Sequence, residues 1–171
     1  MRHRVVVGVS GSPGSLTALH RAAAEARERD AELCAVLAWH APGTGYGGRC
    51  SCDPAVFRAC REASVERLRA ALETAFAVHG PGTALTALAV RGMPGPALVD
   101  AVHSPDDLLV VGTGRRGRLL GALRTPVAVH CLAHASCPVL AVPPNPLEAE
   151  LTAMRRAPWR RLPGPAGKAQ L

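Results

Sequence analysis

Apolar runs of strand length alternate with segments of helical periodicity along most of this chain. Runs rich in β-branched or aliphatic residues predict strands over residues 5–9, 31–39, 83–91, 108–111 and 138–142. Between them, apolar positions at helical spacing predict a helix from Ser15, which serves as its N-cap, and a long helix over 54–78 capped by Asp53. A short helix ending near His103 and another over 125–134 complete the pattern.

The alternation of strands and helices sets the expected fold class. Each predicted strand is continuously apolar, as are the strands of parallel sheets that helices cover on both faces. We therefore expect an α/β domain with a five-stranded parallel sheet over residues 1–143. Residues 144–171 are rich in Pro, Arg and Gly without apolar periodicity, which predicts a flexible tail.

The distribution of apolar residues also bears on location. The sequence contains no run of about 18 apolar residues, so we expect no membrane span. The basic start, residues 1–4, lacks the long apolar region and the cleavage site of a secretory signal. Both features lead us to expect a cytoplasmic protein.

The formal net charge of +7 is high enough to suggest a nucleic-acid partner. Its distribution argues against one, because helical segments mix both signs, as solvated faces do. Base stacking also needs aromatic residues between the cations. The arginines gather in two clusters, and Trp159 in the second cluster is the one aromatic residue among them. The clusters are Arg115, Arg116, Arg118 and Arg124, and Arg155, Arg156, Arg160 and Arg161. We therefore expect no nucleic-acid partner.

The six cysteines fall into two groups. Those in apolar runs, where free buried thiols are expected, are Cys34, Cys131 and Cys137. Those that form a loose cluster without the C-x-x-C pairs of a structural zinc site are Cys50, Cys52 and Cys60. We interpret this cluster as ordinary loop thiols, and not as a metal site or a redox pair.

Two histidines, His130 and His134, stand four residues apart on one predicted helix. Residues at this spacing share a helix face, so the pair could hold a metal or an anion between them. A histidine pair at the edge of the core is the favoured interpretation. We therefore expect no metal at this pair.

Two Gly-rich turns follow predicted strands and are the candidate ligand-binding loops. Residues 112–117 spell G-x-G-x-x-G, but a dinucleotide fingerprint belongs after the first strand and needs an acidic residue about 20 positions on. Here no Asp or Glu lies between Asp107 and Glu148. The first turn, residues 8–15, lacks the Lys of a P-loop. At these turns backbone N–H groups and arginines could bind an anion. Alternatively, the turns are only structural and their arginines are solvated.

Four segments of the chain resemble, in order, the universal stress protein family: RVVVGVSGSPGSLTALHRAAAEARERDAELCAVLAWHAP, VRGMPGPALVDAV, DDLLVVGTGRRGRLLG and HASCPVLAV. The resemblance covers about residues 3–143. It implies a Rossmann-like fold with a five-stranded parallel sheet, akin to the adenine nucleotide α-hydrolases. It also implies ATP as a ligand, since many members bind it, and no metal is expected beyond the Mg²⁺ that accompanies ATP. The resemblance further implies a homodimer through the last strand, residues Val139, Leu140, Ala141 and Val142.

The resemblance assigns candidate nucleotide contacts, but the phosphate motif departs from the family pattern. Members that bind ATP carry G-x2-G-x9-G-[ST] after the fourth strand. Gly112 matches its first glycine, and the other three positions hold Arg115, Thr125 and Pro126. Ser10 stands where the family usually carries an acidic residue near the base and sugar. The implied contacts are Ser10, Gly11, Ser12, Ala38, Gly112, Thr113, Gly114, Arg115, Gly117, Arg118, Thr125 and Val127.

Three functions are compatible with these residues. The favoured one is a dimeric, non-enzymatic stress-response or regulatory protein whose degraded motif binds ATP weakly or not at all. The second is an ATP-binding switch or slow ATPase with a rearranged Gly/Arg loop. The third is an adenylating enzyme, because Ser10, Gly11 and Ser15 match an S-G-G-x-D-S pyrophosphatase loop, although Gly14 stands at its acidic position. We expect no catalytic residue.

Overall fold

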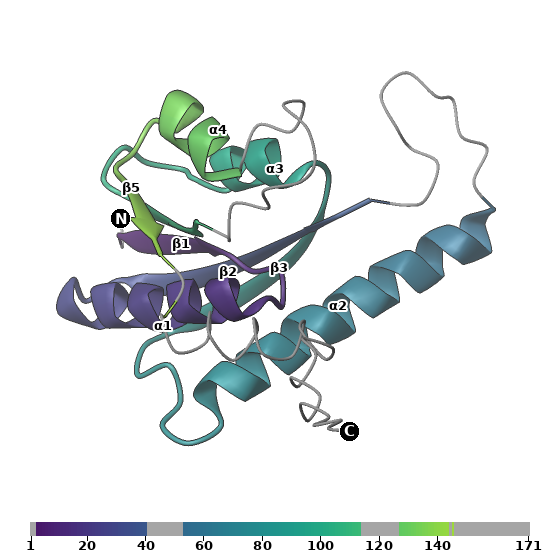
Figure 1. Ribbon diagram of the computed structural model, residues 1–171, viewed down its shortest axis with the longest axis horizontal. Helices are drawn as coiled ribbons and strands as arrows, with labels where there is room; N and C mark the ends of the chain where they lie inside the picture. The colour runs from purple at the N-terminus through teal and green to yellow at the C-terminus, as the bar shows by residue number, and fades with distance from the viewer. Residues whose placement is uncertain (1–2, 41–52, 114–126, 144, 146–171) are drawn as a thin grey trace, which may run out of the picture.

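The computed structural model describes residues 3–40, 53–113, 127–143 and 145. Its described elements alternate between strand and helix (Figure 1). They are, in chain order, β1 (Arg4–Gly8), α1 (Pro13–Glu28), β2 (Glu32–Trp39), α2 (Pro54–Phe76), β3 (Leu85–Arg91), α3 (Pro94–Asp100), β4 (Leu108–Gly112), α4 (Val127–His134) and β5 (Val139–Val142). The strands form one parallel sheet in the order β3-β2-β1-β4-β5. The predicted five-stranded parallel α/β fold is therefore confirmed.

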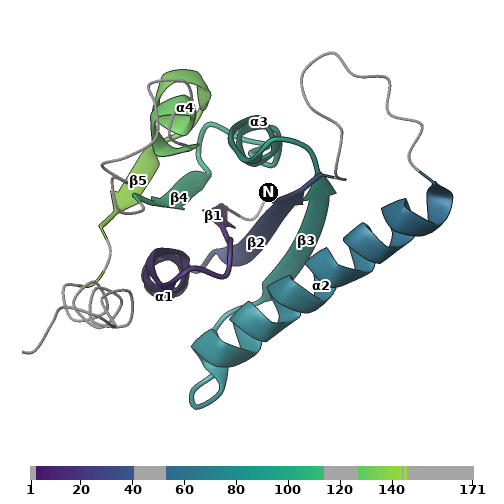
Figure 2. The same ribbon diagram turned by 45° about the vertical axis from the view of Figure 1, so that its right-hand side comes forward.

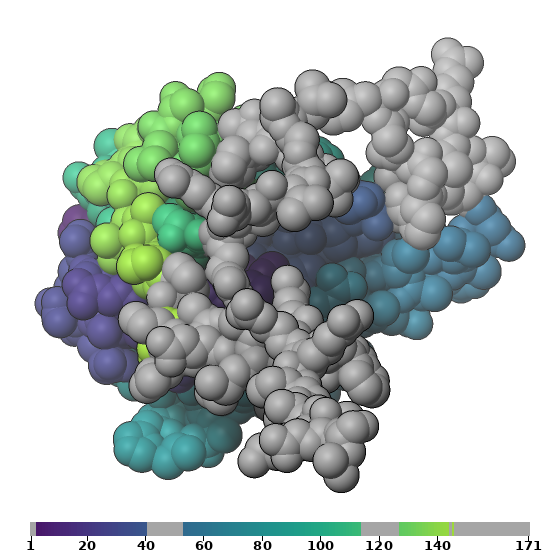
Figure 3. Space-filling view, viewed as in Figure 1, coloured from purple at the N-terminus to yellow at the C-terminus, as the bar shows by residue number. Residues whose placement is uncertain are grey.

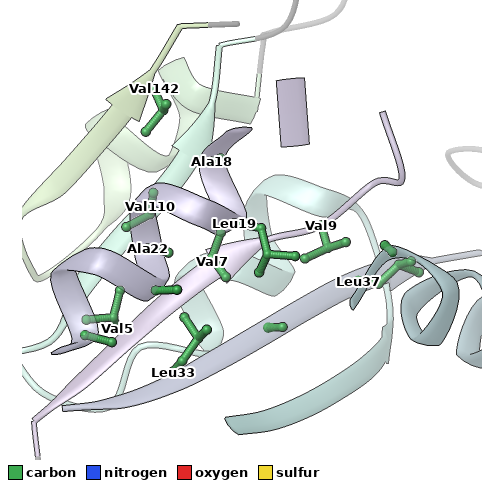
Figure 4. Packing of buried hydrophobic residues seen from close by; sticks show 14 of the residues in the cluster. Val5, Val7, Val9, Ala18, Leu19, Ala22, Leu33, Leu37, Val110 and Val142 are labelled. Atoms are coloured by element: carbon green, nitrogen blue, oxygen red, sulfur yellow. The ribbon is translucent and has the colours of Figure 1, made fainter. Parts of the chain in front are cut away.

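Helices cover both faces of the sheet (Figure 2). α1 and α2 lie on one face, and α3 and α4 lie on the other. Successive strand residues point to opposite faces, so the core divides into two parts. Figure 4 shows the part under α1, where Leu19 and Ala22 of the helix lie next to Val7 and Val110 of the sheet.

The first helix begins earlier than predicted. Ser12 is the N-cap of α1, and its side-chain oxygen accepts a hydrogen bond from the Ser15 backbone N–H at 3.3 Å. The prediction of Ser15 as N-cap was therefore wrong, because Pro13, whose fixed φ suits a first helical position, already starts the helix. The predicted cap of α2 is confirmed, since Asp53 Oδ1 accepts a hydrogen bond from the Ala55 N–H at 2.8 Å.

Asp107 holds the amino end of the sheet together. Its carboxylate, in a residue only 3% exposed, accepts hydrogen bonds from the backbone N–H groups of Arg4 (3.2 Å), His103 (2.9 Å) and Ser104 (3.1 Å). These bonds draw His103 and Ser104 into a turn. For that reason α3 ends at Asp100 and not near His103 as predicted.

One strand departs from the predicted burial. The residues of β1, β2 and β4 are buried or half-buried as expected, whereas Leu85 and Leu88 of β3 are 36% and 39% exposed. In the described sheet β3 is an edge strand with β2 as its one neighbour. On the face that carries Leu88, α3 packs mainly on β1 and β2. The expectation that every strand is buried on both faces was therefore wrong for β3.

α2 is the longest described element, yet a small part of its surface rests on the sheet. Within this fully described helix only Ser64, Leu68 and Ala71 are buried. Its N-terminal end extends past the sheet (Figures 1 and 2). Neither α2 nor any other helix in the described part of the chain combines the length and apolarity that crossing a membrane requires.

Candidate functional site

The carboxyl ends of β1 and β4 lie side by side in the middle of the sheet. The chain leaves β1 for a helix on one face and leaves β4 toward a helix on the other face. Ligands of open α/β sheets bind at such a switch point, outside the carboxyl ends of the strands. Both Gly-rich turns begin here, since Gly8 ends β1 and Gly112 ends β4.

The turn after β1 presents three of the predicted contacts at the surface. Gly11 has a φ of +77°, which favours glycine. The Ser10 and Ser12 hydroxyl oxygens lie 2.9 Å apart, and the Ser12 N–H points to the Ser10 oxygen at 3.4 Å. The Ser12 oxygen also caps α1 through the Ser15 N–H. The hydroxyls of this turn are therefore already engaged with one another and with the helix.

Gly112 lies directly against the first turn of α1. A Cβ at Gly112 would lie 2.7 Å from the Gly14 carbonyl oxygen and 3.2 Å from the Gly14 carbonyl carbon. Both are closer than ordinary van der Waals contact, and the obstacle is main chain. The glycine that matches the family motif is thus required by the packing of β4 against α1.

Thr113 is committed to the neighbouring strand. Its backbone N–H donates a hydrogen bond to the Val142 carbonyl oxygen at 2.8 Å, and its hydroxyl lies 3.3 Å from the same oxygen. These contacts extend the β4–β5 ladder by one residue beyond Gly112. The predicted contact at Thr113 therefore has a structural role in the protein alone.

The remaining predicted contacts are divided between described and undescribed parts of the chain. Ala38 is half-buried near the end of β2, with Val90 as its Cα partner on β3. Val127 is half-buried at the first residue of α4. The residues of this set that lie outside the described residues, together with the motif position Pro126, are Gly114, Arg115, Gly117, Arg118 and Thr125.

A cation that the sequence did not indicate lies over the turn after β1. The Arg67 side chain of α2 passes so close to Gly11 that a Cβ there would lie 3.6 Å from Arg67 Cγ and 3.8 Å from Cδ. Arg67 stands on the flank of α2, beside the buried Ser64 and Leu68. No local pattern links it to a turn so distant in the sequence. The contact places a basic side chain at the edge of the candidate site.

An aromatic and cationic cluster lies at the neighbouring ends of β2 and β3. Trp39 and Arg91 are Cα partners across these strands. Phe57 of α2 packs edge-on against Trp39, with ring centroids 5.1 Å apart, and lies 4.7 Å from the Arg91 guanidinium carbon. The Trp39 indole N–H is buried and has no hydrogen-bond partner among the described residues. The cluster therefore places the guanidinium of the exposed Arg91 beside the site, while the indole N–H of Trp39 is enclosed.

Burial keeps the thiols of the core protonated. Cys34, Cys131 and Cys137 are free and buried, and burial raises the pKa of each of these thiols. The expectation of free buried thiols is therefore confirmed. Cys60 is free and half-buried, but it lies in α2 and packs on the core, so the expectation of a loop thiol was wrong for it. Cys50 and Cys52 lie outside the described residues. Within the described part of the chain, no three or more His, Cys, Asp or Glu side chains are grouped to hold a metal ion.

Comparison with known proteins relates these features to a family. The sequence matches the model of the universal stress protein family over residues 1–143. No curated protein matched the sequence.

Several solved structures share the fold. A universal stress protein crystallised in complex with cAMP is 27% identical, with a TM-score of 0.62 over 84% of this chain and 99% of that one. A family member from Burkholderia pseudomallei is 25% identical, with a TM-score of 0.57 over 84% of this chain and 97% of that one. A family member from Arabidopsis thaliana with AMP bound is 20% identical, with a TM-score of 0.55 over 85% of this chain and 94% of that one, and shows the fold alone.

Proposed function

This chain belongs to the universal stress protein family, and we propose that it is a non-enzymatic regulatory member that binds ATP weakly or not at all. The carboxyl ends of β1 and β4 form an edge of the sheet that suits a nucleotide, but three of the four positions of the phosphate motif have changed. The proposal places the family domain in residues 1–143, a tail in residues 144–171, and the protein in the cytoplasm.

The packing around Gly112 is the observation that carries the proposal. The Gly14 main chain leaves no room for a Cβ at this position, so the fold requires the glycine with or without a phosphate. The other motif positions hold Arg115, Thr125 and Pro126. The one motif residue that the chain retains is therefore explained without a ligand.

The changed residues oppose the way in which a phosphate is held. Pro126 has neither a backbone N–H nor a hydroxyl to donate, and a side chain at Arg115 blocks the close main-chain approach that glycine permits. Two lost hydrogen bonds to a charged phosphate, at about 1.5–3 kcal/mol each, weaken binding by about 10²- to 10⁴-fold. This loss turns tight binding into weak binding.

Calorimetric titration of ATP with Mg²⁺ tests the proposal, together with acid extraction of the purified protein for bound nucleotide. We expect no nucleotide in the extract and no saturation at micromolar ATP. The triple variant Arg115→Gly, Thr125→Gly, Pro126→Ser restores the motif and should gain at least about a hundredfold in affinity. A tight, stoichiometric complex of the unaltered protein with ATP would overturn the proposal.

A second candidate function is a nucleotide-binding switch with a rearranged loop. The complex of a 27% identical family member with cAMP favours it, as does the Arg67 side chain beside Gly11. On this alternative, Arg67→Ala and Arg118→Ala should each lower ATP affinity. Measurable ATP binding that neither variant changes would exclude the rearranged loop.

We also propose that the protein is a homodimer joined through β5. In the described sheet β5 has β4 as its one neighbour, so its other edge offers unpaired backbone groups to a second strand. Figure 3 shows β5 and α4 as one continuous surface. Sedimentation velocity should find a dimer that Ala141→Lys converts to monomer, whereas Leu88→Lys on the opposite edge strand leaves it intact. A monomeric unaltered protein would contradict this interface.

A further inference from the structure

β3 forms an edge of the described sheet, with β2 as its one neighbour (Figure 2). Its register with β2 runs from Leu85 to Arg91 without a bulge. Proteins usually protect such an edge by a lysine or a proline within the strand, by a bulge or by a covering segment. β3 reads LTALAVR, so it has neither lysine nor proline, and its one charged residue is its last. The strand is therefore a template on which a further strand can pair.

The hydrogen bonds at the two ends of β3 show which way its backbone groups point. The Ala84 carbonyl oxygen accepts a hydrogen bond from the Leu33 N–H at 2.9 Å. The Gly92 N–H donates to the Trp39 carbonyl oxygen at 2.8 Å, so positions 84 and 92 both face β2. In a parallel ladder the N–H and C=O of one residue point to the same side, and successive residues alternate. The residues whose backbone groups point away from β2 are therefore Leu85, Ala87, Ala89 and Arg91.

Apolar side chains flank this outward row of backbone groups. Leu85 is exposed on the sheet face that α1 and α2 cover, since its partner Leu33 belongs to that part of the core. Leu88 is exposed on the opposite face, where its partner Val36 belongs to the core under α3 and α4. Ala87 between them is exposed and small, which leaves room for the side chains of a neighbouring strand. An added strand would therefore cover apolar surface on both faces of the sheet.

Positive charge stands at both ends of β3. The exposed Arg91 is its last residue. Arg27 of α1 lies against the turn before β3, where its Nη1 donates a hydrogen bond to the Pro81 carbonyl oxygen at 3.0 Å. Residues 74–99 contain no acidic residue, and Glu32 of the neighbouring strand already accepts a hydrogen bond from a threonine of β3. The charge at this edge therefore suits an acidic partner.

We propose that β3 binds an extended peptide, aliphatic in its middle and acidic at its ends, as a further strand of the sheet. Main-chain hydrogen bonds to the outward residues of β3 hold the peptide, and its carboxylates lie near Arg91 and Arg27. A second copy of this chain is a poorer occupant, an argument that rests on the homodimer proposed above through β5. Self-pairing at β3 as well would join such dimers into an array without end.

Titration of the ¹⁵N-labelled full-length protein with a synthetic peptide tests the proposal. The peptide is as long as β3, alternates valine with threonine, and carries glutamate at both ends. In the free protein the outward amides of Leu85, Ala87 and Ala89 should exchange rapidly with solvent, and bound peptide should slow this exchange. The inward amides of Thr86 and Leu88 should be protected with or without peptide. This alternation within one strand distinguishes strand pairing from binding elsewhere.

Variants and altered peptides separate the backbone contribution from the charge. Ala87→Pro removes one outward N–H, a change that edge strands tolerate, and it should weaken the peptide complex at least about threefold. The matched control Ala87→Val keeps the N–H and should bind as the unaltered protein does. A peptide that is N-methylated at alternate residues should bind at least about tenfold more weakly, whether or not the proline variant folds. A peptide with lysine at both ends should lose about threefold or more.

Several results would overturn the proposal. They are outward amides that stay unprotected at saturating peptide, and N-methylated or lysine-ended peptides that bind as tightly as the original. Outward amides already protected in the free protein would show that this chain covers its own edge. Assemblies larger than a dimer in sedimentation velocity, if Ala87→Pro disperses them, would show that a second copy occupies β3. Ala141→Lys at β5 should leave peptide binding unchanged, so failure of the homodimer and failure of this proposal are seen separately.

Discussion

Replacing Gly112 with alanine tests whether packing alone requires this glycine. The added methyl group would lie 2.7 Å from the Gly14 carbonyl oxygen. This atom belongs to the first turn of α1 and cannot rotate away as the end of a side chain can. α1 must therefore shift relative to β4. That shift loosens the contacts of Leu19 and Val110 in the core between them.

The size of the effect follows from this overpacking. Inserting a methyl group into a packed interior costs about 1–3 kcal/mol. For a domain of this size, about 2–4 °C of Tm is lost per kcal/mol, so we expect a Tm lower by about 2–12 °C. Gly8→Ala is the matched control, because Gly8 also ends an inner strand and its Cβ would lie 2.8 Å from Leu98 Cδ1. That methyl group can move, so its cost should be smaller.

Thermal and urea denaturation followed by circular dichroism, on protein freed of nucleotide, measure the Tm and the unfolding free energy of both variants. The expected order of stability is unaltered protein, then Gly8→Ala, then Gly112→Ala. The packing argument is refuted if Gly112→Ala matches the unaltered protein or is no less stable than Gly8→Ala. Either result would return the glycine to a role in ligand binding.

Three other predictions follow from buried groups. Asp107→Ala leaves three backbone N–H groups without their acceptor, so it should lower the unfolding free energy by about 2–4 kcal/mol. An unchanged urea midpoint would contradict this. Iodoacetamide should alkylate Cys60 before Cys34, Cys131 and Cys137, because burial shields these three thiols and raises their pKa. Equal alkylation rates by mass spectrometry would disprove this prediction. The raised pKa of these thiols also predicts that stability is intact below the unfolded-state pKa near about 8.5 and falls as the pH rises above it. A smaller alkaline loss in Cys34→Ala than in the unaltered protein would be the measured sign.

The strands were predictable because their apolar runs are continuous and end at turn residues. The start of α1 was harder to predict, since Ser12 and Ser15 are both good caps within one Gly- and Ser-rich turn. The two differ in their place relative to Pro13, which starts the helix. Local sequence therefore fixes an element more firmly than it fixes its first residue.

The exposure of β3 and the contacts of the site depend on neighbours that local sequence does not contain. Leu88 of β3 and Val36 of β2 are Cα partners with similar apolar side chains, yet α3 packs over β2 and leaves Leu88 exposed. The edge that carries the two Gly-rich turns could be predicted, because the carboxyl ends of parallel strands share one edge. The obstacle at Gly112 and the approach of Arg67 arise between distant segments, so only the folded arrangement reveals them.

The central position of β1 has a consequence for synthesis on the ribosome. β1 is made first, yet one of its edges is closed by β4, and the Arg4 N–H joins the Asp107 carboxylate across 103 residues. At about 5–20 residues per second, translation leaves that edge open for about 5–20 seconds. An apolar strand with an open edge is a template for unwanted pairing with another nascent chain. The speed of elongation between β1 and β4 therefore sets how long each new molecule is exposed to aggregation.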